Sequence, residues 1–416
     1  MKIGIVGTGI SGLSCAHLLQ HDHDITLFES NNYAGGHTNT IQVNDNGKNI
    51  NVDTGFIVYN NENYPNLCKL FDLLDVQGRN SDMSFSVVNE KTGLEYNGSG
   101  FNKLFCQRQN LLNPGFWKML RDIFKFNDKA PGLLLNGLDD KMTVNDFVKK
   151  NAYSNQFINE YLIPLGASLW SAPAGEFLQY PIRFVIEFLN NHRMLQVANR
   201  PAWKTVKGGS NTYVKKILDS FHGQLRLNTP VKHVTRSKNK IDITLASGQS
   251  ETFDEVILAS HADQCLQMVQ NPGGIERGLL GMFPYQYNEA ILHYDTEILP
   301  SNNNAWASWN YRIPSQEADH VTVTYNMNML QGLDASRTYC VSLNQSSGIA
   351  NSKIIKRIQY HHPVFQPGRA DAQASHHRLI RHQRISYCGA YWGYGFHEDG
   401  IKSALAVCSA YGKELN

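Results

Sequence analysis

The sequence lacks several features that mark particular classes of protein. Its seven cysteines are dispersed and form no CxxC pair, so no zinc cluster or dithiol redox motif can be read from it. No run approaches the roughly twenty apolar residues of a membrane span. Lys and Arg are scattered and the formal net charge is only +2, whereas nucleic acid binding needs a concentrated basic face. We therefore expect no metal site and no nucleic acid partner, but a small-molecule partner.

The N-terminal segment carries no recognisable targeting signal. Met1 leads directly into an apolar stretch, without a charged segment followed by an apolar h-region, so we expect no secretory signal peptide. The dispersed cysteines are typical of buried, reduced thiols. Together these features predict a cytoplasmic location and leave a peripheral membrane contact open.

Size and composition predict a fully folded chain of more than one domain. With 416 residues, the chain is long for one compact core, which favours two or three domains, interleaved or in series. The fractions of hydrophobic residues (42%) and charged residues (18%) are those of ordinary globular proteins, so no disordered tail is expected. Such a chain can enclose a large ligand.

The first twelve residues contain the most informative motif. An apolar strand over Lys2–Val6 runs into the turn GTGISG and then into a helix over residues 13–19. In such a turn, Gly7 permits the tight bend, Gly9 lets the backbone approach a pyrophosphate, and Gly12 lets the helix pack on the strand. The helix N-terminus presents free N–H groups and a positive dipole end to an anion. The arrangement predicts a dinucleotide site, with a purely structural glycine turn as the alternative.

The next strand strengthens this prediction. It covers residues 25–28 and ends at Glu29, whose carboxylate can accept hydrogen bonds from both hydroxyls of an adenosine ribose. Strand, turn, helix, strand and acidic residue therefore follow in the order of a nucleotide-binding unit.

Further elements are predicted from periodicity and turn residues. Residues 80–200 are mixed but mostly helical, and residues 270–370 are rich in strands, which include 321–325 and 339–343. The remaining predictions are a hairpin of residues 40–43 and 50–52, helices over 64–74, after Gly208-Gly209-Ser210 and over 400–411, and strands over 225–227, 230–234, 241–245, 253–259 and 385–390.

One helix, beginning at Asn113-Pro114, has two interpretations. We expect an aromatic and aliphatic stripe on one side of it, made by Phe116, Trp117, Leu120, Ile123 and Phe124. Basic residues surround the stripe: Lys103, Arg108, Lys118, Arg121 and Lys125. The stripe is either a contact with a membrane interface or the mouth of an apolar tunnel, or else the ordinary core-facing side of an amphipathic helix.

These motifs resemble those of a known superfamily. The glycine turn, Glu29, a second glycine pair in residues 35–40 (GGHTNT) and the C-terminal strand, turn and helix are similar to those of FAD-dependent amine oxidases and phytoene-desaturase-like flavoproteins. Residues 53–56, 305–311 and 393–400 are similar to a bacterial branch known only as NAD/FAD-binding proteins, although Trp306 and Trp309 can equally be core residues.

The resemblance implies an α/β fold of the two-dinucleotide-binding-domain type. A Rossmann-like FAD-binding domain (residues 1–75, 201–270 and 376–416) would be interleaved with a mixed α+β substrate-binding domain (76–200 and 271–375). The residues implied to contact FAD are Gly7, Gly9, Ile10, Ser11, Gly12, Glu29, Ser30, Gly35, Gly36, His37, Thr38, Thr54, Gly55, Val231, Gly389, Asp399, Gly400 and Ile401.

Within this set, five residues have specific implied roles. The backbone of Val231 matches the position that meets the adenine, and Asp399-Gly400-Ile401 match the helix start beneath N1 and the C2 carbonyl of the flavin. A helix N-terminus there stabilises negative charge near N1. His37 stands where relatives usually have an arginine facing the phosphates, so FAD affinity is expected to be weaker or pH-dependent, unless His37 is only a surface turn residue.

Other departures from the superfamily concern the chemistry. Amine oxidases of this type usually have a lysine that reaches the flavin N5 through water, yet no lysine lies between Lys240 and Lys353. They also have a glutamate shortly after the glycine of the last strand, where this chain has Tyr391, in a glycine-rich turn more like that of desaturases. No cysteine occupies an obvious attachment position, so we expect FAD to be bound non-covalently.

The resulting functional hypothesis is an FAD-dependent oxidoreductase that removes a hydride from an apolar, lipid-like substrate and passes the electrons to an unidentified acceptor. We expect Trp392, Tyr394 and Phe396 to line the substrate face of the flavin. His397 and Glu398 either handle protons or fix the turn. The alternatives are a flavin amine oxidase that releases hydrogen peroxide and a non-redox flavoprotein, an isomerase or a carrier of lipidated partners.

Overall fold

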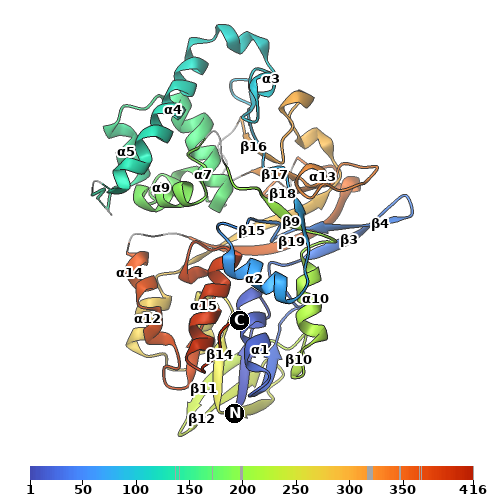
Figure 1. The fold of residues 1–416 in the computed structure, drawn as a ribbon, viewed down its shortest axis with the longest axis vertical. Coiled ribbons are helices and arrows are strands. Elements are labelled where there is room, and N and C mark those ends of the chain that lie inside the picture. Colours follow the sequence, from blue (N-terminus) through green and yellow to red (C-terminus); the bar gives the residue numbers. More distant parts are fainter. Residues whose placement is uncertain are drawn as a thin grey trace.

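A parallel five-stranded sheet brings distant parts of the chain together in the lower half of the molecule (Figure 1). The computed structural model describes residues 1–135, 137–139, 141–170, 172–196, 200–315, 322–345, 348–364, 366 and 368–415. The strand order is β10 (Gln224–Arg226), β2 (Asp24–Phe28), β1 (Lys2–Val6), β14 (Glu255–Leu258), β20 (Ile385–Tyr387). Because every pairing is parallel, all five strands end at one edge, where open α/β sheets bind ligands.

Both faces of this sheet are covered. Side chains alternate along β1, so that Ile3 and Ile5 pack toward the helices while Val6 packs toward the opposite layer. The helical layer contains α1 (Ile10–Leu19), α10 (Asn211–Asp219) and α15 (His397–Ser409). The opposite layer contains the antiparallel strands β11 (Val231–Ser237), β12 (Lys240–Leu245) and β13 (Ser250–Phe253) with α11 (Ala262–Met268) and α12 (Gly274–Leu280). The predicted α/β class is confirmed.

The strand predicted over residues 253–259 is present as β14, but its predicted start is two residues too early. β13 ends at Phe253 and β14 begins at Glu255, so that β13 pairs antiparallel with β12 while β14 pairs parallel with β1. Asp254, between them, is held by Lys2, whose backbone N–H donates to the Asp254 carboxylate at 2.7 Å. The sequence runs through this switch without a glycine or proline, so only Asp254 marked it.

A seven-stranded sheet lies above the first one (Figure 1). Its order is β19 (Ile354–Pro363), β15 (Tyr285–His293), β18 (Cys340–Leu343), β17 (Val323–Asn326), β16 (Trp309–Ile313), β7 (Phe85–Asn89) and β8 (Leu94–Asn97). The strand-rich region predicted over 270–370 is confirmed, although Val321 lies outside the described residues. Residues 78–80, 85–89 and 94–97 are strands, so the mostly helical segment begins later than residue 80.

Helices between residues 101 and 191 form the upper part of the molecule (Figure 1). They are α3 (Phe101–Leu104), α4 (Pro114–Leu135), α5 (Val144–Lys150), α6 (Asn155–Phe157), a π-helical turn (Ile158–Leu162), α7 (Ile163–Trp170), α8 (Ala174–Phe177) and α9 (Ile182–Asn191). Their buried side chains, such as Phe116, Phe157 and Phe188, form one apolar core that also includes Val87 of β7.

The stripe predicted on α4 is wrong in its orientation. Phe116 is fully buried, whereas Trp117 is 47% exposed and Phe124 is 60% exposed. Consecutive residues on a helix point about 100° apart, so Phe116 and Trp117 do not share a face. The core-facing side is made by Phe116, Met119 and Phe126, and part of the predicted stripe points to solvent.

The remaining elements agree with the expected hairpin and helices. The hairpin is β3 (Thr40–Asp45) with β4 (Lys48–Asp53), and its turn has positive φ at Asn46 and Gly47. The helices predicted over 64–74 and after Ser210 are α2 (Pro65–Leu73) and α10. Short strands and helices complete the structure: β5 (Val58–Tyr59), β6 (Gly78–Asn80), β9 (Lys204–Val206), α13 (Met327–Leu330), α14 (Arg369–Ala374) and 3₁₀ turns at Arg108–Leu112, Thr296–Ile298, Asn303–Ala305, Asn351–Lys353, His376–Leu379 and Ala390–Trp392.

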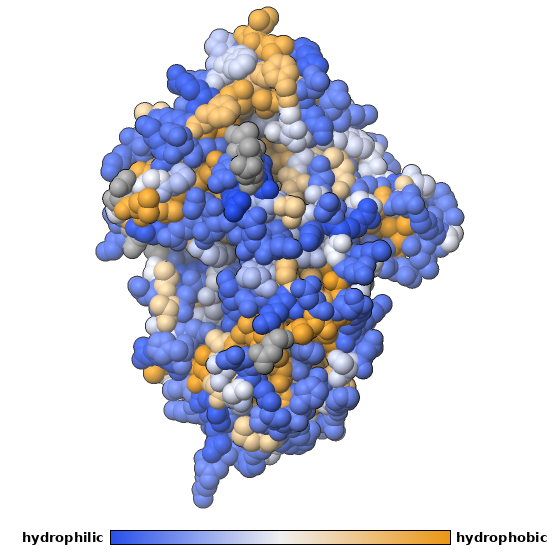
Figure 2. Space-filling view, viewed as in Figure 1, coloured by the Kyte–Doolittle hydropathy of each residue, from blue (hydrophilic) through white to orange (hydrophobic). Residues whose placement is uncertain are grey.

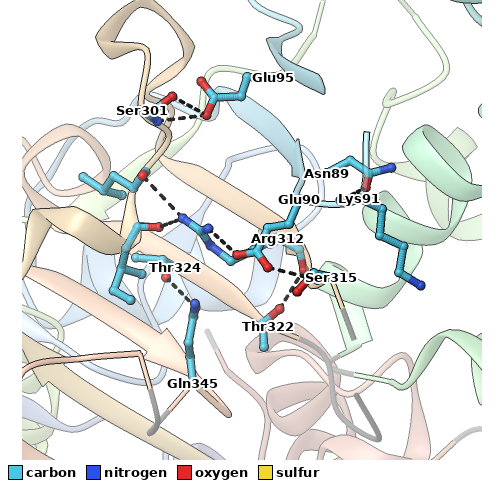
Figure 3. Close-up of polar contacts among 12 residues, drawn as sticks. Asn89, Glu90, Lys91, Glu95, Ser301, Arg312, Ser315, Thr322, Thr324 and Gln345 are labelled. Atoms are coloured by element: carbon cyan, nitrogen blue, oxygen red, sulfur yellow. Dashed lines mark hydrogen bonds and ion pairs between the residues drawn. The ribbon is translucent and has the colours of Figure 1, made fainter. Parts of the chain in front are cut away.

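Polar contacts fasten the edge of the seven-stranded sheet near β7 and β16 (Figure 3). The Arg312 guanidinium lies 2.7 Å from a Glu90 carboxylate oxygen and donates at 2.7 Å to the Ile298 carbonyl. The other Glu90 oxygen accepts the Ser315 backbone N–H, and the hydrogen bond from Arg312 lowers the pKa of Glu90. These charged groups are engaged within the sheet, so we assign them a structural role.

Candidate functional site

The glycine turn after β1 has a backbone that other residues would not fit. Gly7 has φ of +102°, and a Cβ on Gly12 would lie 2.0 Å from the Gly7 carbonyl oxygen. By contrast, a Cβ on Gly9 would meet no atom within 4 Å. Helix α1 starts directly after Gly9, with no side chain capping its N-terminus in the described structure and no acidic residue in its first turn. The turn therefore leaves open space beside free N–H groups, which suits an anion.

Glu29 lies at the end of β2, buried beside this turn. One carboxylate oxygen accepts hydrogen bonds from the N–H and hydroxyl of Thr8, at 3.1 and 2.5 Å. The other accepts from the N–H and side-chain amide of Asn31, both at 2.9 Å, and weakly from Ser30. The side chain is thus fixed in place, and each oxygen has only limited capacity left for a ribose hydroxyl.

Val231 lies close to the same corner. The Glu29 carbonyl accepts the backbone N–H of Thr229, two residues before Val231, at 2.8 Å. Strand β11 begins at Val231, two residues after this hydrogen bond, so the backbone of Val231 lies near the end of β2. The residue predicted to meet the adenine therefore lies on the side of the predicted ribose ligand.

The second glycine pair packs against the first turn. Gly35 donates its N–H to the Thr8 carbonyl at 3.1 Å, and a Cβ on Gly36 would lie 3.2 Å from the Gly9 Cα. Both Gly35 and Gly36 have positive φ, +127° and +59°. The two glycine segments therefore enclose the same space.

The chain after this pair continues the enclosure. A Cβ on Gly55 would lie 2.2 Å from the His37 carbonyl oxygen, which also accepts the Phe56 N–H at 2.8 Å. The Thr54 hydroxyl donates to the Asn39 carbonyl at 2.8 Å. Residues 37–39 and 54–56 therefore run side by side, which explains why both segments belong to one predicted site.

The N-terminus of α15 meets the N-terminus of α1. The Ser11 hydroxyl donates to the Gly400 carbonyl at 2.9 Å, and a Cβ on Gly400 would lie 2.6 Å from the Ile10 side chain. Ile401 is buried beneath them, and the Gly389 N–H donates to Ser403 of α15 at 2.9 Å. Helix α15 begins at His397, before the predicted start at residue 400, because the Asp399 carboxylate accepts the Phe396 N–H at 3.0 Å. Burial raises the pKa of Asp399 to about 6.

These residues form one continuous path that fits FAD. It runs from Glu29 past the open side of Gly9 and past His37 to the start of α15. The Nε2 of His37 is buried, and no described residue supplies a hydrogen-bond partner for it. An anionic diphosphate fits between the two glycine segments, and the polar edge of a flavin fits at the α15 N-terminus. The described residues thus suit the dinucleotide, although the individual FAD contacts remain predictions.

The three aromatic residues predicted to line the flavin lie in two different places. Tyr394 and Phe396 pack against α9, with ring centroids 5.4 Å (Tyr394 and Phe184) and 5.2 Å (Phe396 and Phe188) apart. Trp392 instead stacks on His376 at 4.3 Å and packs on the core beneath the five-stranded sheet. The structure therefore brings Tyr394 and Phe396 together and separates Trp392 from them.

His397 and Glu398 are both engaged in contacts between elements. The His397 ring stacks on Phe56 at 3.6 Å, and its Nε2 lies 2.9 Å from the Thr38 hydroxyl and 3.1 Å from that of Tyr213. Burial holds the pKa of His397 well below its usual value. Glu398 accepts the backbone N–H groups of Asn66 and Leu67 at the start of α2. These contacts favour the turn-fixing interpretation, and a proton-handling role remains a prediction.

A surface cleft opens beside Tyr394 and Phe396. Its volume is about 290 Å³, and its walls also include His192, Tyr64 and Asp399. It lies where the ends of α2, α9 and α15 meet. The cleft gives the aromatic pair a side that is open to solvent.

Sequence reasoning missed two groups near the site. Asp53 is fully buried and accepts hydrogen bonds from Thr40, Ser210 and Gln331, and burial raises its pKa to about 6. Three further histidines lie here: His261 and His362 have ring centroids 6.1 and 5.5 Å from that of His37, and His361 lies beside His261. Only the motif position of His37 could be read from the sequence, because the other three come from residues more than 200 positions away.

Comparisons with known proteins agree with this geometry. Residues 10–312 match the family of flavin containing amine oxidoreductases. An L-amino-acid oxidase of Mus musculus is 24% identical over 289 residues, covering 65% of this chain and 43% of the relative. A flavin-containing amine oxidase A of Bos taurus is 22% identical, covering 58% of this chain and 45% of the relative. The chain thus matches less than half the length of these curated relatives.

Solved structures share the whole fold at low identity. A CLA-producing fatty acid isomerase from P. acnes has a TM-score of 0.70 at 15% identity, with 98% of each chain covered. A cyclohexylamine oxidase from Brevibacterium oxydans IH-35A has a TM-score of 0.70 at 13% identity, with 99% of each chain covered. These likenesses confirm the predicted fold class.

The family match covers well over half of the chain, and the site is built on the residues that carried the resemblance. It confirms the predicted superfamily and the FAD cofactor. The chain belongs to the family of flavin-containing amine oxidoreductases.

Proposed function

We propose that this protein removes a hydride from an apolar, lipid-like substrate and passes the electrons to a separate acceptor. FAD, when bound, supplies the hydride-accepting chemistry, while the protein orients the substrate and excludes water. In this proposal, FAD is bound non-covalently by residues 1–75, 201–270 and 376–416, and the substrate by residues 76–200 and 271–375.

The aromatic layer at the start of α15 is the observation that carries this proposal. Phe184 and Phe188 of α9 pack on Tyr394 and Phe396, which directly precede the helix start predicted to lie under the flavin. A substrate positioned there meets aromatic rings, which favour an apolar chain over a strongly hydrated one. We propose that Tyr394 and Phe396 contact the substrate, and that Trp392 and His397 position the turn that holds them.

The position of the first lysine after the long gap disfavours amine oxidation. Lys353, the first lysine after the long gap, precedes β19 and pairs with Asp295 at 2.9 Å. Residues 361–363 lie at the other end of β19, about 27 Å away at about 3.3 Å per residue. Lys353 therefore does not replace the lysine that amine oxidases use, and the amine oxidase remains the second candidate only because of the family match.

Anaerobic addition of substrates to the purified holoenzyme tests the proposal. Acyl lipids and fatty acids should bleach the flavin absorbance, whereas primary amines and polyamines should not. Bleaching by amines with release of hydrogen peroxide in air would replace the proposal by amine oxidation. Since a fatty acid isomerase shares the fold, the products are analysed too, and an isomerised product without net bleaching would indicate a non-redox reaction. A colourless protein that cannot be reconstituted with FAD would support a carrier.

Variants locate the substrate within the site. Phe396→Ala should lower kcat/KM for the acyl substrate by about tenfold or more, because it removes a large apolar contact. Leu73→Ala is the matched control, since Leu73 is 52% exposed on α2. Equal effects of the two changes would contradict the proposed position of the substrate.

We further propose a peripheral contact with an anionic lipid surface through the tip of the helical region. The apolar tip consists of Phe101, Leu111, Leu112, Trp117 and Phe124. Leu112 is 88% exposed and Phe101 is 63% exposed, and apolar surface is visible at the top of the molecule in Figure 2. Three exposed basic residues, Arg108, Lys118 and Arg121, lie along the same segment. The one acidic residue between 101 and 125 is Asp122, and it is buried. Apolar side chains rimmed by cations suit anionic headgroups.

No helix in the described ranges is long and apolar enough to cross a bilayer, so the proposed contact is interfacial. The seven cysteines are free, which fits the reducing cytoplasm in which we place the protein. Sedimentation with vesicles tests the contact: phosphatidylserine vesicles should bind the protein, and Trp117→Ser with Phe124→Ser should abolish binding, whereas Leu73→Ser should not. Failure to bind, or concentration-dependent dimerisation through the tip, would overturn the proposal.

A further inference from the structure

Four histidines from three parts of the chain form a connected group of rings beside the site, with the exposed His361 at its outer side. His37 follows the second glycine pair, His261 follows β14, and His361 and His362 lie near the end of β19. Ring centroids are 5.5 Å apart for His37 and His362, 6.1 Å for His37 and His261, and 6.3 Å for His261 and His361. We call these four residues the histidine cluster.

The cluster borders the middle of the FAD path. On one side of His37, Gly36 approaches Gly9 of the first turn; on the other, Thr38 contacts His397 at the start of α15. His261 comes two residues after Ala259, whose carbonyl would lie 2.8 Å from a Cβ on Gly7. A dinucleotide that extends from α1 to α15 must therefore pass these imidazoles.

Stacking holds two rings of the cluster, and the Nδ1 of His362 lies 3.1 Å from the side-chain nitrogen of Asn288. His37 stacks on Tyr360 at 4.7 Å, and His261 stacks on Tyr285 at 4.3 Å. The Nε2 of His37 is buried, and no described residue offers it a hydrogen bond. No group of three or more histidine, cysteine or acidic side chains in the described part of the chain is arranged to hold a metal ion. An anion that accepts hydrogen bonds is the remaining ligand of suitable chemistry.

We propose that the histidine cluster binds the diphosphate of FAD in place of the missing arginine, and that it takes up about one proton from solvent when FAD binds. One neutral imidazole becomes an imidazolium, which donates hydrogen bonds to phosphate oxygens and compensates part of their charge. The inference rests on the FAD cofactor and not on the proposed substrate.

The electrostatics of the free protein favour neutral imidazoles. Burial and the neighbouring histidines lower the pKa of His37 to about 4 and those of His261 and His362 to about 3. Other titratable or charged groups that act on the cluster or on the rings packed against it are Tyr33, Asp53, Asp263, Cys265, Tyr285, Tyr287, Tyr360, Arg369 and His397. A diphosphate would add the dominant negative charge at this point.

The sign of the pH dependence follows from linkage. A bound anion raises the imidazole pKa, so between the free value of about 4 and the value in the complex, binding takes up a proton. Affinity is therefore highest at low pH and decreases by up to about tenfold per pH unit, until pH exceeds the pKa in the complex.

Release of FAD from the holoenzyme measures this effect. The holoenzyme is diluted at constant ionic strength between pH 6 and 8, and the fluorescence of free FAD gives Kd. Calorimetric titration of the FAD-free protein in buffers of different ionisation enthalpy counts the protons. We expect Kd to rise about tenfold over this range, with an uptake near one proton per FAD at pH 6 that decreases toward zero at pH 8. Riboflavin, which lacks phosphate, should bind without proton uptake.

Variants distinguish the cluster from other titrating groups. His37→Arg supplies a permanent charge and should give a flat pH profile with tight binding at pH 8. His37→Gln should weaken binding at pH 6, and His222→Gln, an exposed histidine at the other end of the sheet, should change nothing. If the His37 variants fail to fold, His362→Gln, at the ring 5.5 Å from that of His37, must reduce the proton count instead. A pH-independent Kd without proton uptake in the unmodified protein, or an unchanged slope in His37→Arg, would overturn the inference, whatever the substrate is.

Discussion

The glycine turn and helix α4 differ in how strongly packing limits the residue types that fit at each position. At Gly12, one added methyl group would lie 2.0 Å from a backbone oxygen that cannot move away, so only glycine fits. On α4, Trp117 and Phe124 are largely exposed beside the buried Phe116, and their identities are not dictated by packing. The cofactor side is thus specified by backbone geometry, and the helical side by the size and polarity of side chains. Substitutions in each region can test whether this difference is real.

The largest effect is expected from Gly12→Ala. Its Cβ would collide with the Gly7 carbonyl, and the resulting strain should cost about 3 kcal/mol or more, which exceeds the gain of about 1 kcal/mol from alanine in a helix. We expect loss of FAD together with a large decrease in thermal stability of the FAD-free protein.

Gly9→Ala in the same turn is the matched control. Its Cβ meets no protein atom within 4 Å, so the FAD-free protein should lose less than about 1 kcal/mol. FAD content after purification should nevertheless fall, because the methyl group occupies the space predicted for the pyrophosphate. Equal Tm values for both FAD-free variants would show that the turn is less constrained than its geometry indicates.

Within α4, Phe116→Ala should be the next largest change. Removing a fully buried ring should lower the free energy of unfolding by about 3 to 5 kcal/mol, measured by urea denaturation. Phe124→Ala, two turns further along, should stay within about 0.5 kcal/mol because its ring is 60% exposed. Similar losses for both would mean that the exposed ring is covered in solution.

The same contrast explains what the sequence could predict. The turn at Gly7–Gly12 and the acidic end of β2 could be predicted, because the glycine spacing and the acidic residue stand within one short stretch of sequence. The faces of α4 were predicted wrongly, since the aromatic residues are so dense that several helical faces look apolar. The histidine cluster and the contact from Glu398 to Asn66 join residues more than 200 positions apart, and no local pattern marks such pairs.

A smaller effect is expected at the junction of the two regions, from Glu398→Gln. The buried Glu398 carboxylate accepts N–H groups at the start of α2, where the helix dipole also favours a negative charge. Its loss should cost about 2 kcal/mol in unfolding free energy. Glu62→Gln, a half-exposed glutamate in the same cleft, should change it by less than about 0.5 kcal/mol. A lower kcat with unchanged stability would instead assign Glu398 to proton handling.

The smallest effect is expected from Asp399→Asn, and it depends on pH. Burial raises the pKa of Asp399 from 3.8 to about 6 in the folded protein, so between these values the folded state binds more protons than the unfolded state. Stability conferred by the protonated carboxyl is therefore present below pH 4 and is lost as pH rises to about 6. The shift corresponds to at most about 3 kcal/mol, and to about 1 kcal/mol once water screening of this partly exposed group is included. Urea unfolding of the FAD-free protein between pH 4 and 7 should show the unmodified chain losing this amount relative to Asp399→Asn, because asparagine does not titrate. If the difference in unfolding free energy between the two proteins is constant over this range, the α15 N-terminus stabilises the carboxylate more than burial destabilises it. The cofactor side then tolerates a negative charge at Asp399 better than its packing indicates.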